Sequence, residues 1–331
     1  MTVNTGSDFI RVKGTSFVLN NEIYSYIGTN FWYGMNLASL SPGGNRKRLI
    51  LELDILHALG ILNLRIMAGS EGPDSSPWRI LPAVQTSPGV YNTELLECLD
   101  FLLTEMGKGG MKAVLCLTNF WEWTGGLAQY LLWHGAGPIP YPNIRKEWHT
   151  FQQYTARFFS ETESKRCLNS YIHFLISRVN SCTGIPYRDD PVIMSWQLCN
   201  EPRGMNNESA FNRWIDDTSA FIKNLDPNHL ISTGTEGSPP FRHAGVDFIK
   251  NNSFSCIDYT TAHLWVQNWN IYKPGKHKET FNHSVKFAID YIDEHIKKSE
   301  MLNKPFVLEE FGFPRDFAAF SPGSTTINRD K

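Results

Sequence analysis

The chain has 331 residues, of which 41% are hydrophobic and 19% are charged, and its formal net charge is -2. This length and apolar content allow one large hydrophobic core, so a single barrel-sized domain fits as well as two smaller ones. The nearly balanced charge argues against a surface that binds nucleic acid or anionic membrane. No apolar run reaches the roughly 20 residues that a membrane-spanning helix needs.

Near the N-terminus, the segment FVLNNEIY (17–24) predicts a hairpin that turns at two asparagines, and we expect residues 1–25 to cap a larger fold. Strand-like apolar runs then alternate with amphipathic helical segments. The expected strands are 26–33, 61–67, 112–119, 192–200, 230–235, 256–265 and 305–311. The expected helices are 46–59, 93–108, 164–181, 209–225, 243–251 and 280–300.

This alternation predicts a parallel sheet with crossover helices, either an open doubly wound sheet or a closed barrel. No glycine-rich phosphate loop follows the first strand. Polar and aromatic residues instead follow nearly every strand, as they do in barrel enzymes, whose active sites lie at the carboxyl ends of the strands. We therefore predict an α/β fold, a (β/α)₈ TIM barrel, with residues 1–331 forming a single catalytic domain.

The pattern contains seven strands, so strand 8 and its helix are missing from the expected barrel. The first and seventh strands would then have unpaired edges, and we expect the chain to be a C-terminally truncated barrel. The connection 120–163 is longer than ordinary loops and rich in tryptophan. We expect this connection to form an ordered wall of a cleft.

Two glutamates end strand candidates: Glu201 in WQLCNEPRG and Glu310 in PFVLEEF. Two carboxylates at one barrel face fit retaining glycoside hydrolysis, in which one protonates the leaving oxygen and the other attacks the anomeric carbon from about 5 to 5.5 Å away. The alternative is that each glutamate forms a structural ion pair with Arg65 or Arg203. Spacing alone leaves both interpretations open.

An ordered set of motifs resembles the mannanase branch of glycoside hydrolase family 5, in clan A. The motifs are GTNFWYG, TNFWEWTGGLAQYLLW, the Asn-Glu-Pro-Arg of WQLCNEPRG, TGTEG and VLEEFG, and the resemblance covers about residues 9 to 316. It implies an endo-1,4-β-mannanase, which hydrolyses internal bonds of mannan, glucomannan or galactomannan with retention, through a glycosyl-enzyme intermediate. It also implies that neither a metal nor a cofactor is needed.

The resemblance assigns roles to matching residues. Glu201 would be the acid/base, and Glu310 would be the nucleophile. Asn200 would hydrogen-bond the sugar 2-hydroxyl and help to position the reacting ring. Arg65 would hold the nucleophile ionised through a charged hydrogen bond.

His263 and Trp265 match the His-x-aromatic pattern of the sixth strand in the family. His263 would join the hydrogen-bond network around the two carboxylates, and Trp265, where many relatives have tyrosine, would lie near the nucleophile. Glu309 competes with Glu310 for the role of nucleophile. Neighbouring strand residues face opposite sides, so only one of them is expected to point into the cleft, and the family pattern selects the glutamate directly before Phe-Gly.

Further residues are candidate substrate contacts. The strand-end tryptophans favour stacking on sugars over core packing, whereas for Trp269 a cleft wall and loop packing are equally good interpretations. Arg203 either contacts substrate or anchors its own loop, and Glu236 is expected to be a network carboxylate. The candidates are Trp32, Asn119, Trp121, Arg203, Glu236 and Trp269.

Two alternatives to an endo-mannanase remain. One is an exo-acting β-mannosidase or another β-1,4-glycanase of the same clan. The other is a non-catalytic carbohydrate-binding barrel, which would not need two converging carboxylates. We expect a monomer whose partner is a polysaccharide or oligosaccharide, with no nucleic-acid or membrane partner. A polymeric substrate implies a secreted or periplasmic protein, although no signal peptide is visible at the N-terminus.

Overall fold

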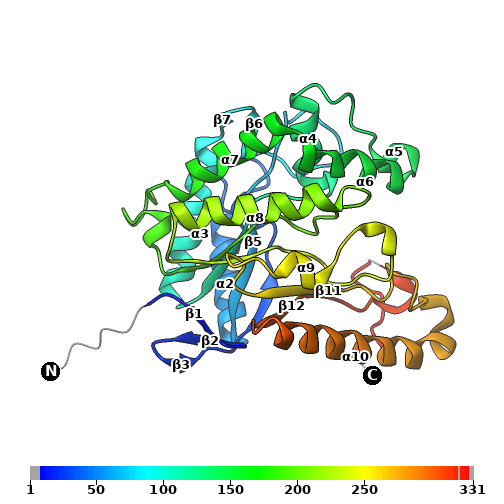
Figure 1. Cartoon of the computed structure of the whole chain (residues 1–331). Helices are drawn as coiled ribbons and strands as arrows, with labels where there is room; N and C mark the ends of the chain where they lie inside the picture. Colours follow the sequence, from blue (N-terminus) through cyan, green and yellow to red (C-terminus); the bar gives the residue numbers. More distant parts are fainter. Residues whose placement is uncertain (1–7, 320, 328–331) are drawn as a thin grey trace.

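The computed structural model describes residues 8–319 and 321–327 (Figure 1). The first element is a small antiparallel sheet of three strands: β1 (Arg11–Lys13), β2 (Ser16–Leu19) and β3 (Glu22–Ile23). Asn20 and Asn21 join β2 to β3 with φ angles of 53° and 67°, as a two-residue hairpin turn with left-handed backbone requires. The predicted hairpin is therefore confirmed, and β1 is an additional strand that the sequence pattern did not predict.

Seven parallel strands follow in the described chain; the strand expected at 61–67 has the expected bounds, and the other expected strands are present in shorter form. They are β4 (Ile27–Asn30), β5 (Ile61–Met67), β8 (Lys112–Cys116), β9 (Ile193–Gln197), β10 (Leu230–Ser232), β11 (Thr260–Leu264) and β12 (Phe306–Phe311). Five of them form a sheet in the order β10-β9-β8-β5-β4, and β11 pairs with β12. Backbone hydrogen bonds from Asp258 to Ile231 (2.8 Å) and from His263 to Glu236 (3.1 Å) place β11 beside β10. The strands are thus arranged around the barrel in chain order.

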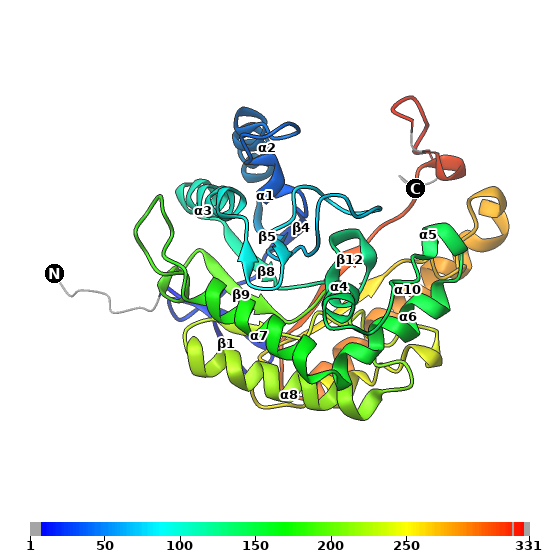
Figure 2. The ribbon, with the colours of Figure 1, turned by 90° about the horizontal axis from the view of Figure 1, so that it is seen from above.

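Helices cover the outer face of these strands, as Figure 2 shows from above. They are α2 (Arg46–Ala58), α3 (Thr93–Lys108), α7 (Thr162–Ile176), α8 (Glu208–Leu225), α9 (Phe248–Asn252) and α10 (His277–Met301). The side chains of Asn45 and Asn92 cap α2 and α3 by accepting backbone N–H groups of the first turn. None of the helices in the described residues is both long and apolar enough to cross a membrane.

Two helices differ most from their predicted bounds. The helix predicted at 164–181 ends at Ile176, because Arg178 and the backbone of Ser181 leave the helix and donate hydrogen bonds to the buried carboxylate of Asp100. The helix predicted at 243–251 begins only at Phe248, where Asp247 caps it. In both places a local polar contact competes successfully with the apolar periodicity.

The connection 120–163 is ordered, as expected, and it is mostly helical, which the sequence pattern did not predict. It contains η1 (Glu122–Thr124), α4 (Gly126–Trp133), α5 (Pro142–Arg145), α6 (Trp148–Ala156) and η2 (Arg157–Ser160). Other short elements outside the predicted pattern are α1 (Gly34–Leu37), β6 (Gln85–Ser87), β7 (Val90–Tyr91) and four further 3₁₀ turns, η3 (Tyr187–Asp189), η4 (Arg242–Ala244), η5 (Pro274–Lys276) and η6 (Asp316–Ala318). Each is only a few residues long, too short to show a full period of amphipathic spacing.

The hydrophobic core has one large part and two smaller ones. The large part fills the space between strands and helices and includes the fully buried Trp196, as expected for its position in mid-strand. A smaller cluster includes Phe17 of the hairpin with Val114, Met194 and Tyr259. The hairpin therefore supplies core side chains to the barrel strands that it packs against.

The first and last parallel strands, β4 and β12, contact each other without a strand pairing between them in the described residues. In the described chain, β4 pairs only with β5 and β12 pairs only with β11. A cavity of about 560 Å³ lies between β4 and β12 and is lined by residues of both strands, among them Gly28, Thr29 and Glu309. The side chain of Asn30 donates a hydrogen bond to the backbone oxygen of Glu309 (3.0 Å) and so links the two strands.

Candidate active site

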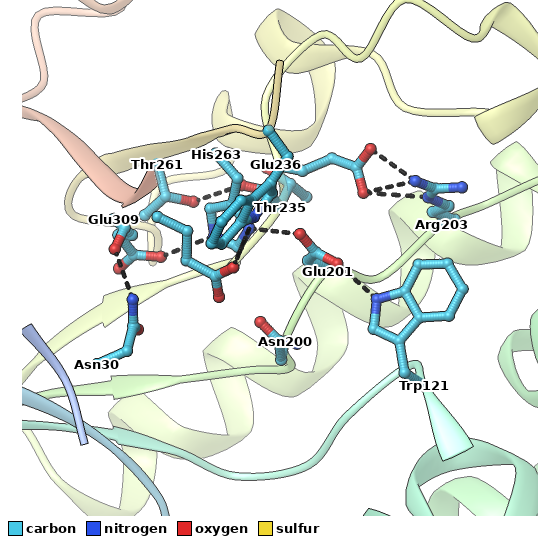
Figure 3. Close-up of polar contacts among 12 residues, drawn as sticks. Asn30, Trp121, Asn200, Glu201, Arg203, Thr235, Glu236, Thr261, His263 and Glu309 are labelled. Carbon is cyan, nitrogen blue, oxygen red and sulfur yellow. Dashed lines mark hydrogen bonds and ion pairs between the residues drawn. The ribbon is translucent and has the colours of Figure 1, made fainter. Parts of the chain in front are cut away.

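Charged side chains from four strand ends converge at the carboxyl face of the barrel. Figure 3 shows Glu201, His263 and Glu309 close together at this face. Arg65 belongs to β5, Glu201 follows β9, His263 belongs to β11 and Glu310 belongs to β12. Glu201 and Glu310 each have a carboxylate oxygen within 4.8 Å of the other and of a ring nitrogen of His263. Since the strands are parallel, their carboxyl ends meet at one face, and this placement follows directly from the fold.

Glu201 lies in left-handed backbone, with φ at 50°, and its N–H donates to the carbonyl of Gly234 (2.9 Å). Its carboxylate accepts one hydrogen bond from Nδ1 of His263 (2.7 Å) and another from the indole N–H of Trp121. Burial opposes the charge, but the hydrogen bond and positive charge of His263 outweigh it and lower the pKa of Glu201. In the free protein, the proton of this pair therefore lies on the imidazole.

Glu310 is bound by different donors. Its Oε1 forms an ion pair with the guanidinium of Arg65, and its Oε2 accepts the indole N–H of Trp265 (3.0 Å). The indole thus makes a contact of the kind that tyrosine could make in relatives. Arg65 also donates to Asn200 (2.9 Å) and Gln197 (2.8 Å), so its guanidinium is fixed on three sides.

Asn200 and Asn119 form a second row of polar contacts at the same face. The amide of Asn200 donates to Oδ1 of Asn119 (3.1 Å), and the same oxygen accepts the backbone N–H of Trp121 (3.1 Å). Both asparagine side chains are buried. Asn119 therefore holds Asn200 and the loop of Trp121 in fixed positions.

Arg203 and Glu236 form a buried bidentate ion pair, with 2.7 Å between Nη2 and Oε1 and 3.1 Å between Nε and Oε2. The guanidinium also lies over the ring of Trp121, 5.0 Å from its centroid. Burial and the nearby charge of Glu201 raise the pKa of Glu236 to about 7, although Arg203 opposes this. These contacts match the interpretations in which Glu236 is a network carboxylate and Arg203 anchors its loop.

The remaining candidate tryptophans have different surroundings. Trp32 is half-buried beside Trp123 (5.8 Å between ring centroids), with the guanidinium of Arg65 over its ring at 4.5 Å. Trp269 is buried, and its ring packs 5.4 Å from that of Tyr291 on α10. Trp32 thus lies beside the charged cluster, whereas the contacts of Trp269 are those of the loop-packing alternative.

Glu309 lies in the same charged cluster as Glu310, although the two neighbouring strand residues were expected to face opposite sides. Its side chain is 3% exposed, and its Oε2 lies 3.5 Å from Nε of Arg65 and 3.5 Å from Nε2 of His263. Simple alternation is wrong here because the register of β11 and β12 shifts: Ala262 pairs with Leu308, and His263 pairs with Glu310. This irregularity lets both glutamates reach the same arginine and the same histidine.

Gln197 is a site residue that the sequence interpretation missed. It lies in β9, and its side-chain amide donates to both oxygens of Glu309 (2.8 and 2.9 Å). The available signal was a glutamine inside an otherwise apolar strand, because a buried amide needs hydrogen-bond partners. That signal predicts a buried polar network without identifying its other members.

Glu201, His263 and Glu310 each have one ligand-type atom within 4.8 Å of the others. Burial lowers the pKa of His263, yet Glu310, Glu201 and Glu309 together raise it to about 10. The group at the centre of this cluster is therefore a proton donor.

Comparison with known proteins identifies the family of the chain. The model of a family described as "GH family 5 beta-mannosidase-like" matches residues 7–331. Mannan endo-1,4-β-mannosidase 7 of Arabidopsis thaliana is 31% identical, over 97% of this chain and 71% of its own length. Mannan endo-1,4-β-mannosidase 4 of Solanum lycopersicum is 30% identical, over 98% of this chain and 77% of its own length.

Among solved structures, a glycoside hydrolase family 5 mannosidase from Rhizomucor miehei is 38% identical, with a TM-score of 0.90 over 98% of this chain and 80% of its own. A mutant of that protein has been solved with mannosyl-fructose, at 37% identity and a TM-score of 0.90 over 98% of this chain and 79% of its own. An endo-β-1,4-mannanase from Thermotoga petrophila is 27% identical, with a TM-score of 0.70 over 89% of this chain and 62% of its own.

Proposed function

Because the chain belongs to glycoside hydrolase family 5, with a match to its β-mannosidase-like model over residues 7–331, we propose that it hydrolyses internal β-1,4-mannosidic bonds with retention of configuration. Mannan, glucomannan or galactomannan would be the substrate. The observation that carries the proposal is the approach of Glu201 and Glu310 to within 4.8 Å, oxygen to oxygen, at the barrel face. Retaining glycosidases place their carboxyl groups about 5 to 5.5 Å apart, whereas inverting enzymes leave room for a water between them.

In the proposed reaction, Glu310 attacks the anomeric carbon while Glu201 protonates the leaving oxygen. The acid form of Glu201 arises when a proton moves from Nδ1 of His263 along the 2.7 Å hydrogen bond to Oε1, which leaves a neutral imidazole. In the second step Glu201 removes a proton from water, which displaces Glu310 from the sugar. Arg65 and Trp265 orient the attacking carboxylate through their hydrogen bonds.

The other polar and aromatic residues would position the sugar. Asn200, fixed between Arg65 and Asn119, is placed to hydrogen-bond the 2-hydroxyl of the reacting ring. Trp32 and Trp121 offer indole faces to sugar rings. We further propose that the protein acts as a monomer and outside the cell, where mannan polymers occur.

A second candidate function is exo-acting β-mannosidase activity. The observation in its favour is that the Rhizomucor miehei mannosidase shares 38% identity with this chain, more than the 31% of the Arabidopsis thaliana mannan endo-1,4-β-mannosidase. An exo enzyme releases single mannose units from chain ends, whereas an endo enzyme cuts the chain internally.

The products formed from mannan, glucomannan and cellulose distinguish these functions. An endo-mannanase should produce a mixture of short oligosaccharides from mannan and lower the viscosity of the solution early. Mannose as the sole early product would indicate the exo alternative, and preferential cleavage of cellulose would overturn the mannan assignment. Proton NMR of the first product tests retention directly, because a retaining enzyme releases the β-anomer first.

The variant Glu310→Ala tests the nucleophile. It should abolish hydrolysis of mannan oligosaccharides while leaving their binding measurable by calorimetry, because the indole faces and Asn200 remain in place. The conservative change Glu52→Gln on the outer helix α2 serves as a control for expression and handling. Undiminished hydrolysis by Glu310→Ala would contradict the assignment of Glu310 as the nucleophile.

A further inference from the structure

Glu309 is a buried carboxylate that the proposed reaction does not use. Its two oxygens accept both hydrogen bonds from the amide of Gln197, at 2.8 and 2.9 Å. Gln197 in turn accepts Nε of Arg65 (2.8 Å) and donates to Ser232 (3.1 Å). A carboxylate held in this way is rigid, and its position relative to its neighbours is defined.

The rigid carboxylate faces the side of His263 that lies opposite the catalytic acid. Nδ1 of the ring lies 2.7 Å from Glu201 and 3.5 Å from Glu310, whereas Nε2 lies 3.5 Å from Oε2 of Glu309. In the described residues, Nε2 has no closer hydrogen-bond partner. Both ring nitrogens therefore face carboxylates, an arrangement that favours a proton on each of them.

We propose that Glu309 is a positioning residue that acts through His263: its negative charge keeps a proton on Nε2, so that the Nδ1 proton is the one exchanged with Glu201. The inference rests on the proposed function of Glu201 as acid/base. In the exchange, the Nδ1–H bond breaks and an O–H bond forms on Oε1 of Glu201, and the imidazolium becomes a neutral ring with its remaining proton facing Glu309. Glu309 thus orients His263 and stabilises its positive charge, and His263 exchanges a proton with Glu201.

The charge of Glu309 also raises the affinity of the cluster for the proton that Glu201 and His263 share. With this proton on Glu201 and a neutral ring, Arg65 carries a positive charge, and Glu309 and Glu310 carry negative charges. Without Glu309 one negative charge is lost, and the same state releases its proton more readily. Loss of the carboxylate should therefore make the acid form of the pair disappear at lower pH.

Other titratable groups surround the cluster and are unchanged by a substitution at Glu309. They contribute a constant background to the titration of His263. These groups are Cys116 on β8, Arg203 and Glu236 at the ends of β9 and β10, and the phenols of Tyr26 and Tyr259 next to β4 and β11.

The test compares Glu309→Gln with Glu309→Asp and with the wild type. The glutamine keeps the size and the hydrogen-bonding oxygen but removes the charge. An opposite charge at this distance shifts a pKa by about one unit or more. We therefore expect the alkaline limb of the profile of kcat/KM against pH to move down by about one unit in Glu309→Gln and by less in Glu309→Asp. Glu122→Gln is a matched control, because Glu122 is another buried glutamate whose carboxylate contacts Asn143.

A readout without substrate separates this proposal from the proposed function. In protein labelled with ¹⁵N-histidine, the ring signals of His263, identified by their loss in His263→Asn, should show two protonated nitrogens at pH 7. Their titration should occur about one pH unit lower in Glu309→Gln.

Unchanged titration and an unchanged alkaline limb would overturn the role of Glu309. If the wild type is inactive on every mannan substrate and the shift in titration is still present, the proposed hydrolysis of mannan is contradicted instead. If Glu309→Gln does not fold, the proposal is tested by the smaller shift in the titration of His263 in Glu309→Asp. If this shift is absent, the proposal is overturned.

Discussion

Glu201 receives its hydrogen bonds from His263 and Trp121, whereas Glu310 receives its own from Arg65 and Trp265. The first carboxylate is thus connected to a group that can exchange a proton. The second is connected to an arginine, which does not deprotonate in proteins. This difference in partners gives two chemically identical side chains separate roles in the proposed reaction.

The roles can be separated by varying the leaving group. Glu201→Ala should lower kcat on mannan by about 10²- to 10⁴-fold, because general acid catalysis contributes about that much. Its kcat/KM for aryl β-mannosides with acidic phenol leaving groups should fall far less, because such groups depart without a proton. Steady-state kinetics on a series of aryl mannosides measures this. A loss that is the same for every leaving group would contradict the assignment of Glu201 as the acid.

The sequence predicted these two glutamates because a charged residue at the end of an apolar strand is unusual and the adjoining motifs are specific. The participation of Glu309 in the cluster could not be predicted from alternation along a strand. It depends on the shifted register between β11 and β12 and on Gln197 from a distant strand, and both arise only when the strands pack.

On the scale of elements, Glu71 connects three segments around the loop that carries Trp121. It follows β5, and its carboxylate accepts the hydroxyl of Thr118 (2.9 Å) beyond β8 and the backbone N–H of Gly126 (2.8 Å) at the start of α4. Gly126 has φ at 58°, and a Cβ there would lie 2.1 Å from the carbonyl of Asn119. The loop 119–126 is therefore held tightly at both ends.

Replacing this carboxylate should loosen the loop. Glu71→Ala leaves the hydroxyl of Thr118 and the N–H of Gly126 unpaired, at about 1–3 kcal/mol for each buried group. We expect a lower melting temperature and a lower kcat, because Trp121 would no longer be directed firmly at Glu201. Thr118→Val, which removes one donor and leaves no unpaired group on Gly126, is the matched control. Calorimetry and kinetics that show no difference between the two variants would contradict this role.

On the scale of the whole molecule, stability should depend on pH through buried histidine. His295 on α10 accepts the N–H of Ser238 on Nε2 (2.8 Å) and donates Nδ1–H to the carbonyl of Tyr291 (2.6 Å). Burial, with a smaller contribution from Lys298, lowers the pKa of His295 to about 4, although the backbone of Tyr291 opposes this. The unfolded chain, with a histidine pKa of about 6.5, binds a proton more readily.

The free energy of unfolding should therefore fall as the pH drops from about 6.5 to about 4, by up to about 3 kcal/mol from this residue. Glu236 contributes in the opposite direction, because its raised pKa makes stability fall as the pH rises from about 4.5 to about 7. The informative quantity is thus the difference between wild type and His295→Gln in urea unfolding. This difference should be larger at pH 7.5 than at pH 5, and His57→Gln on exposed α2 should show no such trend. A constant difference would contradict the assignment.

The arrangement of seven parallel strands and their outer helices could be predicted from apolar periodicity, because each element is long enough to show its period. The helices of the connection 120–163 could not, since they are short and rich in aromatic residues. The packing of Trp269 against α10, which decides between a cleft wall and loop packing, also depends on contacts between segments distant in sequence.

The left-handed backbone of Glu201 has a consequence for how this protein can evolve. A non-glycine residue in that conformation costs about 1–3 kcal/mol, and burying its carboxylate adds to the cost. Selection for thermal stability alone would favour glycine at this position. The protein would then be more stable, but it would lose its activity. A survey of stabilising substitutions should therefore find several of them at the reactive residues, and a variant that gains stability there would do so by giving up turnover.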